Sequence, residues 1–496
     1  MNSVRRKALA AASALTLGIG LAVAGGAVPA ASAASPETTF LVLAPQGAKT
    51  DRAAARVAAA EGTVVARYDQ IGVLVVRSTN PAFATAVVGA GVESVAATAG
   101  LGSALEEGET VEVAAADVAA ATATADPTGE PLIGQQWDMP MIGVPQAHAV
   151  TAGSPDVVVG VLDSGISSTH PDLASQIAKD RSTSCVGGVV DTAEAAWNPT
   201  TSDHGTHVAG TIAAAVNGVG VTGIAPGVKV AAVKVVNNDG FIYPEAAICG
   251  FVWAADHGMQ LTNNSYFIDP WEFNCRNDAR QRPVWQAVQR AIRYSANRGV
   301  LNVASAGNSN YDLAHTFVDP NSPNNGTPEI REINGACLDL PAEAPGVLTV
   351  SAVGPAGEKS YYSSYGQGVV EVTAPGGDSR FRTQGVSPTT TDQILSTTFN
   401  TVTRTNGWGY KQGTSMSGPH ATGVAALALS AHPGMSPGQL TAFLQNTAVA
   451  KPCPEGVYNP APLHADGPHA YDATCSGGAR NGFYGAGMVN AYNVVK

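Results

Sequence analysis

Residues 157–163 read VVVGVLD: apolar residues and one glycine follow one another without interruption until an aspartate ends the run. A continuous apolar run of this length is typical of a strand in a parallel β-sheet, because helices cover both faces of such a sheet. Similar runs occur further along the chain at 228–236, 300–303 and 347–353, and Ala-rich segments expected to be helical lie at 208–216 and 421–431. Strands that alternate with helices predict an α/β fold, with a doubly wound, mostly parallel sheet and helices on both of its faces.

The composition of the whole chain excludes several classes of protein. The chain has 496 residues, of which 45% are hydrophobic and 13% are charged. This is enough apolar material for a large core, and it rules out wholesale disorder. The formal net charge is −12, and no block of basic residues occurs. Nucleic acid is therefore a poor candidate partner.

The N-terminus predicts export from the cell. A basic segment, RRK at 5–7, precedes an apolar stretch from Ala8 to about Val28 that ends in AASA at 30–33. This order is typical of a cleaved secretory signal peptide, which we place at residues 1–33. An uncleaved membrane anchor is disfavoured by the small residues of the stretch and by the cleavage signal. The two adjacent arginines leave twin-arginine export open. We expect a secreted protein that has no contact with the membrane once the signal is removed.

Residues 34–96 are expected to form a small α+β unit. Its elements follow the order β-α-β-β-α-β, which is the split-βαβ, ferredoxin-like plan. The expected strands are 40–43, 63–68, 71–76 and 92–95, and the expected helices are 51–60 and 80–89. A tract rich in Ala, Thr and Glu but without aromatic residues follows at 97–129, and it predicts an exposed, cleavable linker. The α/β pattern occupies the remaining residues, 130–496.

The cysteines predict disulfide bonds, because an exported chain meets an oxidising compartment. There are six, which allow 15 pairings. Proximity in the sequence favours Cys453–Cys475 and Cys275–Cys337, which leaves Cys185–Cys249. No C-x-x-C motif occurs, so a structural zinc site is disfavoured.

The polar residues at the ends of the apolar runs are the candidate functional residues, because ligands bind at the carboxyl ends of parallel strands. Asp163 ends the first run, where a buried carboxylate without a partner would be very costly. Taken alone, an aspartate at such a place is more often a turn residue.

Two further motifs lie at the expected starts of helices. His204 opens HGTHVAG at 204–210, whose glycines allow close approach of the backbone. A metal site at His204 and His207 would lack the glutamate and the spacing of H-E-x-x-H, so His207 is interpreted as a packed histidine. Ser415 lies in GTSMSGPH at 413–420, where the helix dipole and free N–H groups favour developing negative charge. An ordinary serine N-cap is the alternative there.

Asp163, His204 and Ser415 together offer the groups that acyl transfer needs. These are a hydroxyl nucleophile, an imidazole that takes its proton, and a carboxylate that fixes the tautomer of the imidazole. An α/β-hydrolase would instead place the serine first in the chain, within G-x-S-x-G. The window here, GTSMS at 413–417, lacks the final glycine, so that fold is disfavoured.

The chain resembles the subtilisin-like serine protease family. The resemblance rests on VLDSG at 161–165, HGTHVAG at 204–210 and GTSMSGPH at 413–420, and YGAGMVN at 484–490 is similar to the closing strand of the family. It extends from about Gln135 to the C-terminus. It implies a subtilisin-like fold, and it implies that residues 34–96 are an inhibitory propeptide that assists folding and is then removed.

The resemblance also implies catalytic roles. Ser415 would be the nucleophile, His204 the general acid and base, and Asp163 the carboxylate that orients the imidazole. Asn308, in AGN at 306–308, would donate its amide N–H to the tetrahedral oxyanion together with the backbone N–H of Ser415.

The implied substrate-binding residues are less similar to the family. The segment NNS at 263–265 resembles the edge strand that pairs with an extended peptide, but Tyr266-Phe267 stands where the family has Leu-Gly. Residues 309–336 resemble an insertion beside the wall of the S1 pocket. An Asp339 carboxylate at the pocket floor would favour Lys or Arg at P1. The full set is Asn263, Asn264, Ser265, Gly307 and Asp339.

A structural calcium site is implied in the same way, as a cage of oxygen atoms. Val216 stands where the family has a second asparagine in the loop that would form this cage. The implied ligands are the side chains of Asp172, Asn217 and Gln136 (or Gln135) and the backbone carbonyls of Ala215, Val219 and Val221.

The sequence therefore predicts a secreted, monomeric serine endopeptidase that acts on extended polypeptides. It would be made as a zymogen inhibited by its own propeptide and processed somewhere between Ala114 and Trp137. It would need no catalytic cofactor and would act at neutral to mildly alkaline pH, where His204 is uncharged. The rival interpretations are a non-catalytic binding module and an esterase on the same fold.

Overall fold

The structure is a computed structural model that describes residues 36–98, 111–114, 129–323, 329–380, 392–464 and 466–496. The signal peptide expected at residues 1–33 lies outside the described residues. Among the described helices, none combines the length and the apolar character that a membrane span requires.

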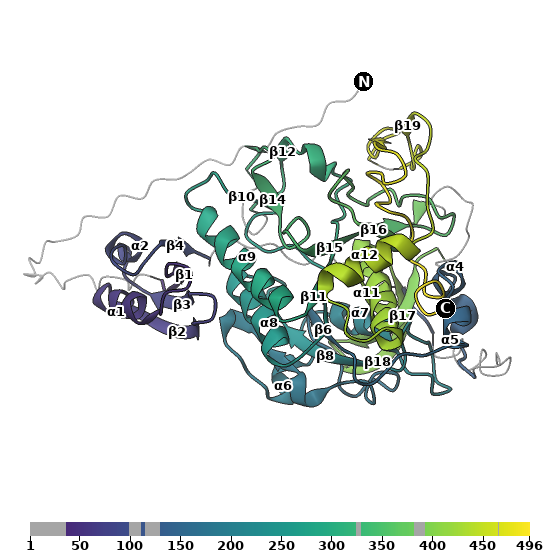
Figure 1. Cartoon of the computed structure of the whole chain (residues 1–496), viewed down its shortest axis with the longest axis horizontal. Helices are drawn as coiled ribbons and strands as arrows, with labels where there is room; N and C mark the ends of the chain where they lie inside the picture. The colour runs from purple at the N-terminus through teal and green to yellow at the C-terminus, as the bar shows by residue number, and fades with distance from the viewer. Residues whose placement is uncertain (1–35, 99–110, 115–128, 324–328, 381–391, 465) are drawn as a thin grey trace, which may run out of the picture. The chain divides into compact units, whose positions relative to one another are not determined.

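A seven-stranded sheet forms the centre of the larger domain (Figure 1). The strand order is β16-β15-β11-β9-β6-β8-β7, and every neighbouring pair is parallel. The strands are β6 (Val158–Asp163), β7 (Thr183–Ser184), β8 (Lys229–Lys234), β9 (Leu261–Asn264), β11 (Leu301–Ser305), β15 (Val347–Val353) and β16 (Val372–Pro375). The predicted doubly wound parallel sheet is confirmed.

Helices cover both faces of this sheet, and β6 shows why its sequence is apolar throughout. Val159 and Val161 belong to the core cluster that contains α7 (His204–Ala213) and α11 (Thr414–Ala431). Val158 and Leu162 belong instead to the cluster that contains α8 (Pro244–Asp256) and α9 (Arg282–Asn297). Successive side chains of a strand point to opposite faces, so a sheet covered on both faces buries every residue of the strand.

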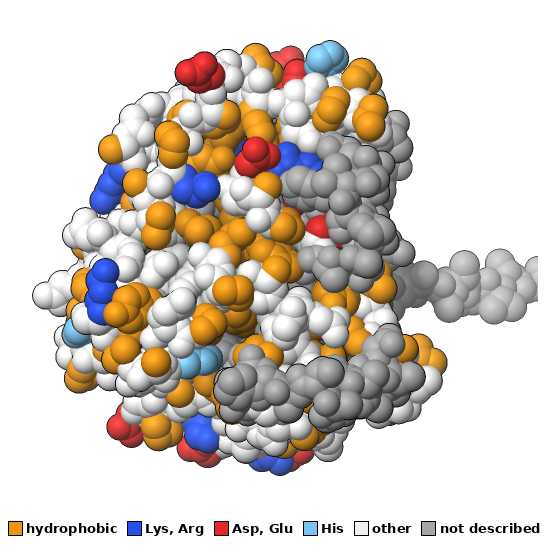
Figure 2. All heavy atoms as spheres, turned by 90° about the vertical axis from the view of Figure 1, so that its right-hand side faces the viewer, with side chains coloured by type: hydrophobic (Ala, Val, Ile, Leu, Met, Phe, Trp, Pro, Cys, Tyr) orange, Lys and Arg blue, Asp and Glu red, His pale blue; other side chains and the backbone are white. Residues whose placement is uncertain are grey.

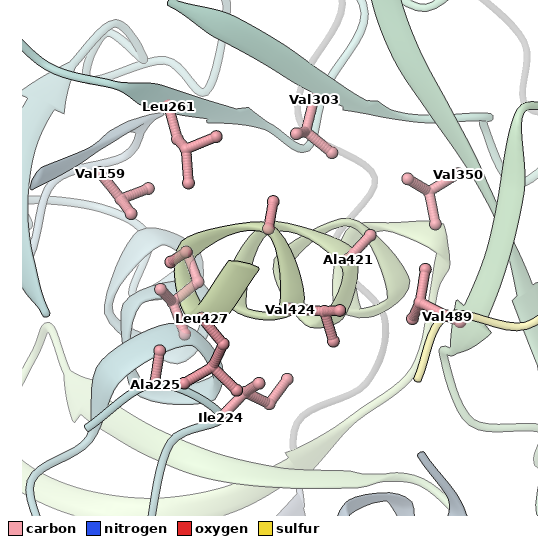
Figure 3. Packing of buried hydrophobic residues seen from close by; sticks show 14 of the residues in the cluster. Val159, Ile224, Ala225, Leu261, Val303, Val350, Ala421, Val424, Leu427 and Val489 are labelled. Carbon is pink, nitrogen blue, oxygen red and sulfur yellow. The ribbon is translucent and has the colours of Figure 1, made fainter. Parts of the chain in front are cut away.

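Helix α11 crosses the first of these faces and is surrounded by apolar side chains. Val159, Leu261, Val303 and Val350, from four adjacent strands, surround one side of the helix, and Ile224 packs on another side (Figure 3). All residues of the helix from Thr414 to Leu429 are buried. This burial fixes the start of the helix, where Ser415 lies, rigidly against the sheet.

The N-terminal unit is a four-stranded antiparallel sheet with strand order β2-β3-β1-β4. Its elements are β1 (Thr38–Leu43), α1 (Asp51–Ala59), β2 (Gly62–Tyr68), β3 (Val73–Ser78), α2 (Phe83–Ala86) and β4 (Ser94–Ala97). The predicted split-βαβ order is therefore present, with its own core around Val42, Val57 and Phe83. The second helix is shorter than the predicted 80–89, and Gly89 and Gly91, with φ of 152° and 91°, lead the chain out of it.

The sequence predicts one exposed linker over 97–129, but part of this tract forms a strand. Within it, β5 (Val111–Glu112) pairs with β18 (Thr405–Lys411), which in turn pairs with β17 (Ile394–Asn400). Most of the rest of the tract lies outside the described residues. The structural reason for the difference is that Val111 and Val113 pack against the larger domain.

The two favoured disulfides, Cys275–Cys337 and Cys453–Cys475, and the remaining pair, Cys185–Cys249, are all present. The second joins β10 (Phe273–Cys275) to β14 (Cys337–Asp339), which pair with each other. The other α-helices and strands among the described residues are α4 (Asp138–Met141), α5 (Val144–His148), α6 (Glu194–Trp197), α12 (Pro437–Thr447), β12 (Val318–Asp319), β13 (Arg331–Glu332), β19 (Val457–Tyr458) and β20 (Ala473–Thr474).

The surface agrees with the low content of charged residues. On the face drawn in Figure 2, the Lys and Arg side chains of the described residues are scattered among polar and hydrophobic ones. The described side chains on this face form no basic stripe of the kind that binds a nucleic acid backbone.

Candidate active site

Asp163 is the last residue of β6, at the carboxyl edge of the sheet. Its side chain is fully buried, and it does have the partner that its burial requires. The Asp163 carboxylate oxygens lie 2.9 and 3.0 Å from Nδ1 of His204, and the backbone N–H of Ser164 donates to Oδ1 at 2.7 Å. Asp163 therefore caps the following turn, which was the alternative left open by the sequence, and also contacts the imidazole of His204.

His204 is the first residue of α7, and its imidazole is almost fully buried. Because Nδ1 faces a carboxylate, Nδ1 carries the proton, and Nε2 is left as the nitrogen that can accept one. Gly205 makes the approach of the helix to β6 possible. A Cβ at this position would lie 2.5 Å from the Gly165 carbonyl oxygen and 3.0 Å from Asp163 Cβ.

Ser415 lies in the first turn of α11, as the motif predicts, and the residue is 8% exposed. Its Oγ donates to the Ser265 carbonyl at 3.4 Å, and Ser265 Oγ donates to the Ser415 carbonyl at 3.0 Å. Pro419, four residues later, has no N–H to offer to the Ser415 carbonyl, so that oxygen is available to Ser265. The proline inside the helix thus helps to join α11 to the segment after β9.

The register of the sheet brings these groups to one edge. β6 and β9 are parallel with Leu162 opposite Asn264, so the next residues, Asp163 and Ser265, emerge side by side. Ser265 contacts Ser415, and Asp163 contacts His204. The carboxylate, the imidazole and the hydroxyl are therefore gathered where parallel sheets bind ligands.

Asn308 follows β11 and reaches the same helix start. Its Oδ1 accepts hydrogen bonds from the backbone N–H of Thr414 at 2.8 Å and from Thr414 Oγ1 at 2.9 Å. Two donors on one atom of the amide identify that atom as the oxygen. Within the part of the chain that the structure describes, Nδ2 of Asn308 has no acceptor. Its N–H groups are therefore available beside Ser415, as an oxyanion donor requires.

The structure corrects the prediction for Asn263 and Asn264. Both are fully buried in β9, a central strand with β6 on one side and β11 on the other, and not in an edge strand. Asn263 Nδ2 donates to Ser265 Oγ, and Asn264 Nδ2 donates to the Val303 carbonyl. Because β9 is paired on both sides, these two residues offer no free strand edge for a substrate. Of the predicted NNS segment, only Ser265 lies beyond the strand.

Asp339 lies beside Gly307. A Cβ on Gly307, whose φ is 90°, would lie 3.6 Å from Asp339 Oδ2. Asp339 is buried, and its backbone N–H donates to Glu343 Oε2 at 2.8 Å. Burial raises the pKa of Glu343 to about 7.

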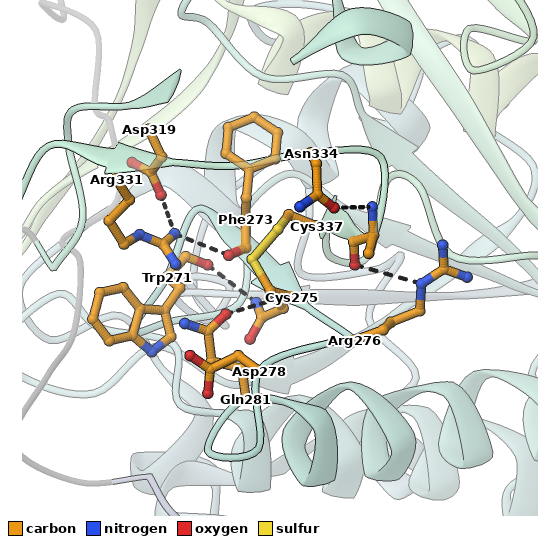
Figure 4. The surroundings of a disulfide bond; sticks show 12 residues. Trp271, Phe273, Cys275, Arg276, Asp278, Gln281, Asp319, Arg331, Asn334 and Cys337 are labelled. Atoms are coloured by element: carbon orange, nitrogen blue, oxygen red, sulfur yellow. Dashed lines mark hydrogen bonds and ion pairs between the residues drawn. A yellow bond between two sulfur atoms is a disulfide. The ribbon is translucent and has the colours of Figure 1, made fainter. Parts of the chain in front are cut away.

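The insertion after Asn308 is attached close to Asp339 through the Cys275–Cys337 disulfide (Figure 4). Arg331 lies over the ring of Trp271, 4.4 Å from its centre, and forms an ion pair with the buried Asp319. The insertion is thus cross-linked to the β10–β14 pair, whose last residue is Asp339.

The sequence did not reveal an ion pair beside His204, between Lys411 and Asp203. Lys411 Nζ lies 2.7 Å from Asp203 Oδ1, and the Lys411 side chain is almost fully buried. Burial tends to raise the pKa of Asp203, but the charge and hydrogen bond of Lys411, together with the Phe399 N–H, hold that pKa below its usual value. This ion pair joins the start of α7 to the end of β18, and no local sequence pattern reveals it.

His207 is a packed histidine, as interpreted from the sequence. Its Nε2 lies 3.1 Å from the Ile394 carbonyl and 3.2 Å from the Gly409 carbonyl. Burial, with the nearby charge of Lys411, lowers the pKa of His207 to about 3, so the ring stays neutral.

The loop expected to hold calcium lies around Asp172, which is fully buried. Asp172 Oδ2 accepts hydrogen bonds from the Trp408 indole at 2.7 Å and from the Val221 N–H at 3.2 Å, whereas its Oδ1 has no partner among the described residues. No donor in that part of the chain reaches the carbonyl oxygens of the three predicted loop ligands, Ala215, Val219 and Val221.

Two other side chains at this loop differ from expectation. The Gln136 amide pairs in both directions with the backbone of Thr222, at 2.9 and 3.1 Å, so it is not placed as a metal ligand. Glu130, which sequence reasoning missed, accepts instead from the N–H groups of Asn217 and Gly218. The described residues contain no group of three or more His, Cys, Asp or Glu side chains that could hold a metal. Any cage here would consist mainly of carbonyl oxygens.

A doubly wound parallel sheet with an aspartate, a histidine and a helix-start serine at one edge defines a serine hydrolase of the subtilisin type. The model of the subtilase family matches residues 154–487. The chain belongs to this family of serine proteases.

Two curated relatives show how far the similarity reaches. Fervidolysin of Fervidobacterium pennivorans is 31% identical to this chain over 66% of the chain's residues. The match covers 42% of the length of fervidolysin. Subtilisin DY of Bacillus licheniformis is 31% identical over 63% of this chain and 90% of its own length.

Solved structures show the same fold over more of the chain. The epidermin leader peptide processing serine protease of Staphylococcus aureus has a TM-score of 0.68 at 20% identity, over 93% of this chain and 98% of that one. The structure of fervidolysin has a TM-score of 0.60 at 23% identity, over 93% of this chain and 61% of that one.

Proposed function

We propose that the chain is a secreted serine endopeptidase, made as a zymogen, that hydrolyses peptide bonds through an acyl-enzyme on Ser415. The observation that carries this proposal is the buried contact between Asp163 and His204 at the sheet edge that also holds Ser415. His204 would take the proton from Ser415 Oγ as this oxygen attacks the scissile carbonyl, and would then give the proton to the leaving amine. The imidazolium that forms in between would be stabilised by Asp163.

The tetrahedral oxyanion would lie between the Ser415 backbone N–H and Asn308 Nδ2. Both donors are held in place before the reaction, Asn308 by Thr414 and Ser415 by the buried start of α11. Donors that need no reorganisation stabilise developing charge most effectively.

A casein assay with and without a serine-directed phosphonyl reagent tests the function. We expect the mature protein to hydrolyse casein and to lose nearly all of this activity on stoichiometric modification. An esterase would hydrolyse activated esters but not casein, and a binding module would do neither. Either outcome would contradict the proposal.

Residues 34–96 are proposed to be the inhibitory propeptide. Several contacts join this unit to the protease domain: Tyr68 donates to the Gly188 carbonyl at 2.7 Å, and Arg290 of α9 donates to the Ala44 carbonyl at 2.8 Å. Arg290 also pairs with Glu93 at 2.7 Å. The sheet of this unit adds Leu41, Val73 and Val75 to the core cluster that contains α8 and α9.

We further propose that Asp339 gives a preference for Lys or Arg at P1. Replacing Asp339 by Asn removes the charge but keeps the shape. We expect kcat/KM for P1 Lys and Arg substrates to fall about tenfold or more relative to P1 Leu, because a charge-assisted pair is lost. Cleavage-site profiling of wild type and variant measures this.

Glu343→Gln is the matched control for Asp339→Asn, because this second buried carboxylate bonds the Asp339 backbone. It should leave the P1 preference unchanged. Identical P1 profiles for wild type and Asp339→Asn would dispose of the assignment.

A structural Ca²⁺ is proposed at the loop around Asp172, with Asp172, Asn217 and the carbonyls of the three loop residues as ligands, and with Glu130 in the position expected for Gln136. A chelator should then lower the melting temperature, since a ligand at 100 times its Kd stabilises the folded state by about 2.7 kcal/mol. Asp172→Asn should remove most of the chelator effect, and the exposed Asp180→Asn should not. A wild-type melting temperature that the chelator does not change would count against calcium.

A further inference from the structure

The strand β5 lies in the tract that joins the N-terminal unit to the protease domain. It pairs antiparallel with β18, with Val111 opposite Tyr410 and Glu112 opposite Gly409. The backbone N–H of Val113 continues the pairing and donates to the Trp408 carbonyl at 2.8 Å. The three-stranded sheet has the order β17-β18-β5, so β5 covers the outer edge of β18.

The side chains of this segment alternate as a half-buried strand requires. Val111 and Val113 pack, with Trp408, against a small apolar cluster of the protease domain. That cluster consists of Leu132, Ala214, Val221, Leu395 and Tyr410. Glu112 points the other way, and its Oε2 accepts from Thr398 Oγ1 at 3.1 Å. The contact between β5 and β18 therefore has a defined register and defined side-chain packing.

The hairpin that receives β5 is tied to the catalytic residues. Lys411, the last residue of β18, forms the buried ion pair with Asp203, which directly precedes His204. Four residues after Lys411 the chain reaches Ser415. Burial is the main cause of the raised pKa of Glu112. The charge of Asp203 raises this pKa further, and the charge of Lys411 lowers it.

Removal of β5 would leave β18 as an edge strand. Unpaired backbone groups at such an edge bind extended segments by strand addition. The structure already shows the segment that fills this edge, namely residues 111–113.

We propose that residues 111–113 are a second docking element of the prosegment, which binds by strand addition to β18 and is separate from the N-terminal unit. This inference rests on the proposed zymogen function. Cleavage after residue 113 would release a prosegment that is held at two places, on α8 and α9 and on β18. The short tract between the two places gives the second contact a high effective concentration, so two-site binding exceeds either contact by roughly 10²–10⁴-fold.

The test compares the full chain with a Val111→Asp/Val113→Asp double variant. Purified zymogens are followed for cleavage on gels and for the appearance of activity. We expect cleavage at an unchanged rate, but release of the cleaved prosegment and the rise of activity at least about tenfold sooner. Val402→Asp is the matched control, because Val402 lies in the turn between β17 and β18 and is 89% exposed. An unchanged delay between cleavage and activity in the double variant would overturn the proposal.

A second measurement does not depend on self-processing. Hydrogen exchange in the full chain carrying Ser415→Ala should show protection on the β5 side of β18, at the backbone amide of Tyr410, which lies opposite Val111. The double variant on this background should lose at least about tenfold of that protection, with Val402→Asp unchanged. The wild type could fail to process itself while the double variant still loses this protection. The zymogen function would then be refuted, and the docking contact would be supported. Equal protection with and without the two valine changes would refute the contact.

Discussion

Ser415→Ala abolishes proteolysis if Ser415 is the nucleophile, with a loss in kcat of roughly 10⁶-fold, a magnitude that comes from subtilisin itself. Among the described residues, no hydroxyl other than that of Ser415 lies at the start of α11 and also contacts Ser265. The same variant, expressed alone, should keep residues 34–96 attached, because processing uses the same nucleophile. Activity on casein and the mass of the purified chain measure the two effects.

Ser417→Ala is the control for this variant. Ser417 lies in the same motif, but its hydroxyl donates back to the Thr414 carbonyl inside the helix. It should retain most activity and mature normally. Efficient maturation of Ser415→Ala with no other protease present would refute self-processing, and casein hydrolysis near the wild-type rate would refute the nucleophile.

Changes at Asn308 should lower kcat by about 10²–10³-fold and leave KM within a few-fold, because the donor acts on charge that develops only in the transition state. Asn308→Asp replaces the donor by a carboxylate, whose charge also opposes the oxyanion. It keeps an oxygen for the Thr414 N–H and removes the amide hydrogens. Asn308→Ala removes both contacts and should also lower the melting temperature.

Steady-state kinetics of both Asn308 variants on one peptide substrate decide the matter. A rise in KM with unchanged kcat would mean that Asn308 binds the substrate and does not stabilise the oxyanion. A kcat close to that of wild type in Asn308→Asp would remove Asn308 from the catalytic groups.

The parts of the fold that depend on local pattern could be predicted from the sequence. The run 157–163 is apolar on both faces of its strand, so it indicated a covered parallel sheet, and β6 is an interior strand of that sheet. Asp163, His204 and Ser415 each stand at the end or start of such an element. The register of β6 with β9 then places Asp163 next to Ser265, and Ser265 contacts Ser415.

Other features depend on contacts between distant segments and could not be predicted. Asn263 and Asn264 belong to the segment that resembles the substrate-binding edge strand of the family, but they are buried in a central strand, where their amides bond to neighbouring interior groups. β5 is too short to give a periodic signal in its sequence, and only its pairing with β18 makes it a strand. Glu130 reaches its loop across a separation of 87 residues.

The rate at which a phosphonyl reagent labels Ser415, with the labelled peptide identified by mass spectrometry, tests the central claim most directly. If Asp163, His204 and Ser415 act as one unit, the wild-type enzyme is labelled at Ser415 alone. Labelling of His204→Ala and of Asp163→Ala then slows by about 10³-fold or more. Labelling at another residue, or equal rates in wild type and His204→Ala, would contradict the account.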